Sequence, residues 1–173
     1  MPTPQNLIDW LKLQPNKDEG GFFAGTYTSS INLPNSVLPG FPPVKSGRPL
    51  SDAIYYFLES GSISVLHKVT GDMVYHFYSG DPVQMLLLYP DNYPNRYEIC
   101  TFSNDIAAGA YPMKVIPGGT WLGSRLTPGG SYALMGVTMA PGFNPVDYTI
   151  GNRKDLIKLY PEVSDTILDF THK

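Results

Sequence analysis

Residues 53–89 read AIYYFLESGSISVLHKVTGDMVYHFYSGDPVQMLLLY, and they carry the clearest fold signal in the chain. The stretch holds segments of strand length that are rich in Tyr, Phe, Val and Ile, namely 53–58, 62–69, 73–78 and 83–89. Short turns containing glycine, aspartate or proline separate them. Aromatic and β-branched residues between such turns favour β-strands.

The chain after this stretch continues in the same way. Further strand-like segments cover 96–102, 113–116, 120–126 and 131–139, again divided by Gly and Pro. About eight strands spaced roughly ten residues apart predict an all-β antiparallel sandwich or barrel. The segment 83–89 is apolar on both faces, which requires cover on both sides from another sheet or another subunit. We therefore expect a homodimer.

The two ends of the chain have helical spacing. Residues 5–13 place apolar side chains near a 3.6-residue period, and so does the tail 152–173. Residues 30–49 contain five prolines and no periodicity, which predicts a long excursion between strands, either a lid or a structureless insertion. With 173 residues, the sequence predicts a single domain over 1–173.

Composition narrows the classes of partner. Charged residues make up 16% of the chain and the formal net charge is -3, so no basic surface for nucleic acid is expected. The apolar runs are too short for a membrane span. Because Cys100 is the single cysteine and the N-terminus lacks a signal-peptide pattern, we expect a cytoplasmic protein that binds a small molecule.

Several segments, in order along the chain, resemble the cupin 5 family, also called DUF985, of the cupin superfamily. The matching pieces are Glu19-Gly20-Gly21-Phe22-Phe23, Arg48-Pro49-Leu50-Ser51, Ser64-Val65-Leu66-His67-Lys68, Tyr75 to Pro82, Val115 to Trp121, Ala140-Pro141-Gly142-Phe143 and Asp147-Tyr148. The resemblance runs from about Leu7 to Lys173. It implies a cupin jelly-roll of two antiparallel sheets around a pocket, usually dimeric. It implies no single reaction.

The resemblance also allows the cupin metal positions to be transferred. Gly80 sets the register, and the ligand positions then fall on Val65, His67, Met73 and Leu122. Only His67 offers a nitrogen or oxygen donor of the kind that divalent cations prefer. We therefore expect no metal and no other cofactor, and a pocket more apolar than in related chains.

His67 is the first candidate catalytic residue. If its strand alternates regularly, Ile63, Val65, His67 and Val69 share the pocket face. His67 is then either a neutral base or hydrogen-bond donor, or a core histidine with a backbone partner. Regular alternation places His76 on the opposite face, where only a bulge would turn it inward.

Other candidates assist His67 or form the wall. Glu19, beside two glycines, is interpreted either as an acid or base or as a turn carboxylate, and Tyr75 as an assisting hydroxyl. Arg48 and Arg125 are expected either to pair with a substrate carboxylate or to form surface ion pairs. Cys100 is interpreted as structural. The remaining predicted ligand-binding residues are Val65, Met73, Phe77, Leu122 and Tyr132.

Three functions remain open on this basis. The leading hypothesis is a metal-independent cupin that binds a small apolar or aromatic metabolite and isomerises, epimerises or cyclises it by acid/base catalysis. The second is a non-catalytic binding or storage protein. The third is a metal-dependent oxygenase whose site is rebuilt from His67, His76 or Glu19.

Overall fold

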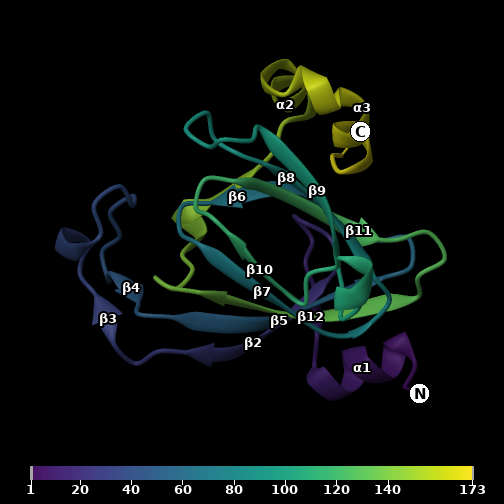
Figure 1. Ribbon diagram of the computed structural model, residues 1–173. Helices are drawn as coiled ribbons and strands as arrows, with labels where there is room; N and C mark the ends of the chain where they lie inside the picture. The colour runs from purple at the N-terminus through teal and green to yellow at the C-terminus, as the bar shows by residue number, and fades with distance from the viewer. Residues whose placement is uncertain (1, 173) are drawn as a thin grey trace.

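Two antiparallel β-sheets face each other in the computed structural model, which describes residues 2–172 (Figure 1). Met1 and Lys173, the ends of the predicted domain and helical tail, lie outside the described residues. The larger sheet has six strands and the smaller one five. The predicted all-β jelly-roll with short terminal helices is confirmed.

The strands between Asp52 and Met139 follow the predicted segments closely, whereas the strands Gln14–Pro15, Phe22–Thr28 and Tyr148–Ile150 lie outside every predicted segment. The six-stranded sheet consists of β1 (Gln14–Pro15), β2 (Phe22–Thr28), β5 (Asp52–Glu59), β12 (Tyr132–Met139), β7 (Met73–Gly80) and β10 (Met113–Ile116). The five-stranded sheet consists of β13 (Tyr148–Ile150), β6 (Ile63–Val69), β11 (Trp121–Leu126), β8 (Val83–Leu88) and β9 (Tyr97–Phe102). The helical elements are α1 (Pro4–Leu11), α2 (Arg153–Leu159) and α3 (Ser164–Asp169), with 3-10 turns η1 (Asn35–Val37), η2 (Ile106–Ala108), η3 (Pro145–Asp147) and η4 (Pro161–Val163). Among residues 2–172, no helix has the length and apolarity needed to span a membrane.

The main core lies between the two sheets. Alternate residues of β7, such as Met73, Tyr75 and Phe77, point inward and meet Met85 and Leu87 of β8. Every second side chain of a strand faces the same side, so this alternation creates the apolar interior directly.

The outer faces of the sheets are covered by the terminal helices (Figure 1). Leu86 and Leu88 of β8 turn away from the main core and pack against Leu156, Ile167 and Phe170 of the C-terminal helical segment. Both apolar faces of 83–89 are therefore covered within one chain. This segment no longer gives a reason to expect a dimer. At the opposite sheet, α1 packs with Leu13 over the outer face near Phe57 and Leu134.

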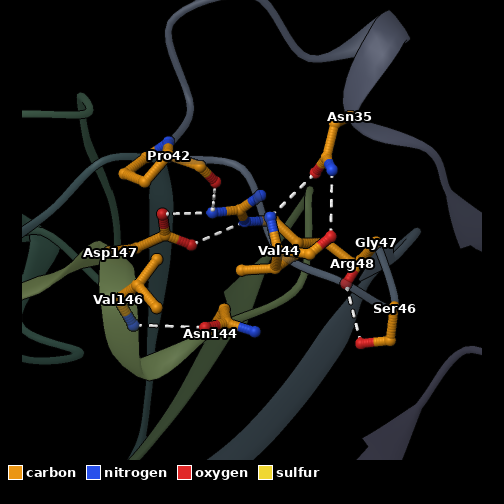
Figure 2. Close-up of polar contacts among 9 residues, drawn as sticks. All are labelled: Asn35, Pro42, Val44, Ser46, Gly47, Arg48, Asn144, Val146 and Asp147. Atoms are coloured by element: carbon orange, nitrogen blue, oxygen red, sulfur yellow. Dashed lines mark hydrogen bonds and ion pairs between the residues drawn. The ribbon is translucent and has the colours of Figure 1, made fainter.

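The Pro-rich segment 30–49 contains a short ladder of its own. β3 (Asn32–Leu33) and β4 (Arg48–Pro49) pair with each other, with Leu33 opposite Arg48. Figure 2 shows how Arg48 fastens this segment to η3: Nε and Nη2 donate to the two oxygens of Asp147, each at 2.7 Å. Nη2 also donates to the carbonyl of Pro42 at 2.7 Å. The segment is thus anchored through a buried bidentate ion pair.

Candidate functional site

A cavity of about 360 Å³ lies between the sheets, and segments from both ends of the chain contribute to its wall. Its lining is mostly aromatic and aliphatic, with a few polar groups, as is usual for small-molecule sites. The lining residues are Asn16, Asp18, Glu19, Phe23, Asp52, Ile54, Tyr56, His67, Val69, Met73, Tyr75, Val137, Met139, Phe143, Pro145 and Tyr148.

Glu19 reaches the cavity because the loop between β1 and β2 passes very close to β6. Gly20 has φ +99°, and a Cβ at this position would lie 2.0 Å from the carbonyl oxygen of Ile63. Only glycine permits this conformation and approach. The loop is then held by the Val65 N–H, which donates to the Glu19 carbonyl at 2.9 Å.

The carboxylate of Glu19 is buried, with 7% of the residue exposed, and three neutral groups donate to it. Ser64 Oγ donates to Oε1 at 2.7 Å. Asn16 Nδ2 and the Tyr148 hydroxyl each donate to Oε2 at 3.2 Å. These bonds fix the carboxylate in the wall of the cavity.

His67 enters the cavity from a bulged part of β6. Leu122 of β11 lies opposite His67, but Ser124, two residues further, lies opposite Ser64, so β6 carries one extra residue between them. Nδ1 of His67 lies 2.9 Å from the carbonyl oxygen of Val65, and 3.8 Å from Glu19 Oε1. Because a carbonyl oxygen only accepts, Nδ1 carries a proton, which leaves Nε2 as the ring nitrogen that can exchange a proton with a ligand.

Three tyrosines around Glu19 keep their protons. Burial, and next the negative charge of Glu19, raises the pKa of Tyr56, Tyr75 and Tyr148 well above the ordinary tyrosine value. The Tyr56 hydroxyl donates to the Gly20 carbonyl at 2.8 Å, and Tyr148 stacks on His67 with the ring centroids 5.4 Å apart. Among residues 2–172, the Tyr75 hydroxyl has no hydrogen-bond partner, so it can donate to a ligand.

Two more carboxylates belong to the lining. Asp18 precedes Glu19 in the same loop, and Asp52 is the first residue of β5. Burial raises the pKa of Asp52, although the Phe143 N–H, which donates to its Oδ2 at 2.8 Å, acts in the opposite direction. The Phe23 and Phe143 side chains also line the cavity.

The structure brings four of the predicted site residues together: Glu19, His67, Met73 and Tyr75 all line the cavity. Three predicted wall residues do not. Val65 lies in the bulge of β6, which turns its side chain out of the lining. Phe77 and Leu122 are buried deeper in the core, where Phe77 packs edge-on against Phe102 at 5.7 Å.

The other four predicted residues lie elsewhere for identifiable reasons. His76 alternates with the inward Tyr75 and Phe77, since no bulge turns it, and lies on the outer face opposite Met113. Tyr132 stacks on Phe57 under α1, with the ring centroids 5.8 Å apart. The arginines are engaged in protein contacts: Arg48 is buried against Asp147, and Arg125 Nη1 lies 3.0 Å from Asp169 near α3.

Sequence reasoning missed Asn16, Ser64, Asp52 and Tyr148. Regular alternation with His67 assigns Ser64 to the outer face, so the sequence did not indicate it. Only the bulge in β6 turns it inward. Tyr148 stands in the Asp147-Tyr148 pair that contributed to the family resemblance, and this was the available signal. Asp52 and Asn16 had no sequence signal beyond their place beside matching segments.

The donor set does not suit the metal that cupins commonly bind. At the transferred positions, Val65 and Leu122 have no donor atom, and Met73 offers only a thioether sulfur beside the His67 imidazole. Within residues 2–172, no three His, Cys, Asp or Glu side chains gather closely enough to hold a metal ion. Divalent cations of this kind need three or four converging nitrogen or oxygen donors.

Comparison with solved structures agrees with the fold. The chain is similar to a protein from Shewanella oneidensis, with 25% identity, a TM-score of 0.83 and 99% of both chains covered. It is also similar to a hypothetical protein from Leishmania major, with 22% identity, a TM-score of 0.85 and 99% of this chain and 100% of that chain covered. A cupin 2 conserved barrel domain protein from Rhodopseudomonas palustris shares the fold at 13% identity and a TM-score of 0.58, over 92% of this chain and 86% of that one.

The family comparison covers most of the chain. No curated protein matches it at a significant level. The family described as Cupin superfamily (DUF985) matches residues 5–151, a range that includes both sheets and the whole cavity lining. The chain therefore belongs to the DUF985 family of the cupin superfamily.

Proposed function

We propose that this protein binds a small, largely apolar or aromatic molecule in the cavity and moves a proton on it, as isomerases, epimerases and cyclases do, without a metal. The observation that carries the proposal is the His67 imidazole. Its Nδ1 is committed to the Val65 carbonyl, and Nε2 is the acceptor on a ring that lines the cavity. An imidazole oriented in this way can act as a general base through Nε2.

The neighbouring groups support this role. His67 Nε2 takes a proton from an acidic C–H of the ligand, and the resulting imidazolium is stabilised by Glu19, whose Oε1 lies 3.8 Å from Nδ1. The electron pair left on carbon delocalises onto an adjacent carbonyl oxygen, which accepts a hydrogen bond from Tyr75. The proton on Nε2 can exchange with solvent at this stage, and return of one proton from Nε2 to a different atom or face completes an isomerisation or epimerisation with no net loss of protons.

Deuterium exchange tests the proposal directly. A molecule that co-purifies, identified by native and denaturing mass spectrometry, and a panel of small aryl ketones would be incubated with the protein in D₂O. We expect deuterium at the carbon next to the carbonyl with the native protein, and a loss of at least about tenfold in His67→Gln, which corresponds to roughly 1.4 kcal/mol. His76→Gln, on the outer face, is the matched control and should exchange normally.

The exchange experiment also separates the alternatives. A non-catalytic binding protein is favoured by the three neutral donors that hold Glu19 in place, because they use its lone pairs for structure. Tight binding with no exchange would establish that function instead. An oxygenase would require a stoichiometric metal ion. Within residues 2–172, no three His, Cys, Asp or Glu side chains gather closely enough to hold one.

We also propose a cytoplasmic setting and a homodimer. The only cysteine, Cys100, is free, which suits a reducing compartment. The outer face of β7 and β10 leaves Tyr78, Met113 and Val115 about half exposed, at 50%, 55% and 50%. Such a patch on an edge of the larger sheet suits a second copy of the chain.

A further inference from the structure

We infer that the molecule bound in the cavity is an organic cation, with a protonated amine or a quaternary ammonium group carried on an apolar body. The inference rests on the proposed ligand-binding role of the cavity and adds the charge of the ligand. It differs from one of the two sequence-based alternatives for Arg48 and Arg125, in which they pair with a substrate carboxylate.

The fixed charges that line the cavity are negative, and His67 is the one basic side chain from residues 2–172 in its lining. Asp18, Glu19 and Asp52 contribute carboxylates, and no lysine or arginine from residues 2–172 contributes to the lining. Arg48 and Arg125, the two arginines considered as partners for a substrate carboxylate, are held outside it, Arg48 by Asp147 and Arg125 by Asp169. A carboxylate ligand would therefore meet repulsion and no guanidinium or ammonium partner.

Two buried carboxylates of this chain have very different hydrogen-bond partners. Asp147, 5% exposed, is neutralised by two hydrogen bonds from the Arg48 guanidinium. Glu19, 7% exposed, receives hydrogen bonds only from uncharged Asn16, Ser64 and Tyr148. The His67 imidazole nearby lies beyond hydrogen-bond distance, with Nδ1 at 3.8 Å from Oε1, and Glu19 has no guanidinium or ammonium partner among residues 2–172. A buried carboxylate without a cationic partner is costly, and a cationic ligand supplies that partner.

The other lining groups fit the same ligand. The rings of Phe23, Tyr56, Tyr75, Phe143 and Tyr148 line the cavity, and the faces of such rings attract ammonium groups. Independently of the carboxylates, His67 and Tyr75 are 2% and 3% exposed, and within residues 2–172 His67 Nε2 and the Tyr75 hydroxyl have no hydrogen-bond partner. These atoms mark a place for polar ligand groups beside Glu19.

The test uses four probes that carry a phenyl group on a short alkyl chain and differ in charge: the cations 2-phenylethylamine and benzyltrimethylammonium, the neutral 2-phenylethanol and the anion 3-phenylpropionate. Dissociation constants would be measured with the native protein by calorimetry or ligand-observed NMR at low salt. We expect the amine to bind at least tenfold more tightly than the alcohol, and benzyltrimethylammonium to bind as well. The carboxylate probe should show no binding at millimolar concentration. Raising the salt concentration should weaken only the cationic probes.

Variants test whether the preference for the amine comes from the cavity. Glu19→Gln should reduce amine affinity at least tenfold while leaving alcohol affinity unchanged, and Asp165→Asn, an exposed aspartate on α3 with the same charge change, should do nothing. If Glu19→Gln does not fold, Asp52→Asn serves, because an asparagine oxygen still accepts from the Phe143 N–H.

Equal or tighter binding of the carboxylate, or no binding of any probe, would overturn the inference. Deuterium exchange that depends on His67 with a neutral or anionic substrate would leave the proposed function intact, so the two failures are distinguishable.

Discussion

Ser64 and His67 reach the same oxygen of Glu19, although two residues separate them on β6. Ser64 Oγ lies 2.7 Å and His67 Nδ1 3.8 Å from Oε1. Their convergence depends on the bulge, which places both side chains on the inner side of the strand. The serine orients the carboxylate, and the carboxylate is then available to balance charge on the imidazole.

Replacing Ser64 by alanine should destabilise the protein and leave the fold intact. Glu19 would lose one of three donors while remaining buried, which costs about 1–3 kcal/mol. Urea unfolding would measure the loss, with Ser60→Ala, at an exposed position without a side-chain hydrogen bond, as control. An unchanged midpoint would mean that Ser64 does not hold the carboxylate.

Breaking the Arg48–Asp147 pair from one side should be far more damaging than replacing both partners. Arg48→Met leaves Asp147 buried and unpaired, and we expect a loss of about 3–5 kcal/mol in the free energy of unfolding. The double variant Arg48→Met/Asp147→Leu should recover a large part of that loss. Additive effects of the two single substitutions would contradict the coupling.

Cys100 should react slowly with alkylating agents. Burial raises the pKa of the thiol to about 11, since the nearby Lys114, which lowers it, is outweighed. The thiolate is the reactive form, so at pH 8 only about one thiol in a thousand is reactive. The rate of iodoacetamide labelling, followed by intact mass, should rise about tenfold per pH unit from 7 to 10. A plateau below pH 9 would disprove the raised pKa.

The outer face of β7 and β10 should hold a homodimer together. Light scattering at micromolar concentration should give twice the mass of the chain, and Met113→Asp should give a monomer. Leu159→Asp, at an equally exposed leucine on α2, should leave the dimer unchanged. A monomeric native protein would remove this proposal.

The purified protein should contain well under one equivalent of Fe, Mn, Ni, Cu or Zn. Because the transferred ligand positions offer only His67 as a nitrogen donor, chelation should change neither the melting temperature nor ligand binding. Elemental analysis and thermal melts with and without chelator would measure this. Stoichiometric metal that disappears in His67→Ala would favour an oxygenase instead.

Much of the fold could be predicted from local pattern, because strand alternation and helical spacing are properties of neighbouring residues. The apolar faces of 83–89 were visible in the sequence. Their partners were not, because Leu86 meets Phe170 through a contact between distant parts of the chain.

The candidate site was predictable where a residue belongs to a regular strand, as for Met73 and Tyr75 on β7. The prediction failed where the backbone departs from regular alternation, because the bulge brought Ser64 inward and turned Val65 away. The arginines could not be placed, since the choice between a ligand and Asp147 as partner is made by packing far from Arg48 in sequence. Nor does the sequence reveal the mainly neutral surroundings of Glu19.

The Arg48–Asp147 pair also bears on the order in which the protein folds. Its members are 99 positions apart in the chain, so the contact closes a very long loop and is entropically costly to form early. The β8–β9 hairpin, whose paired strands are near in sequence, has no such cost. The border of the cavity near Pro145 and Tyr148 is therefore expected to assemble last, so that a nascent chain acquires its sheets before it acquires the ability to retain a ligand.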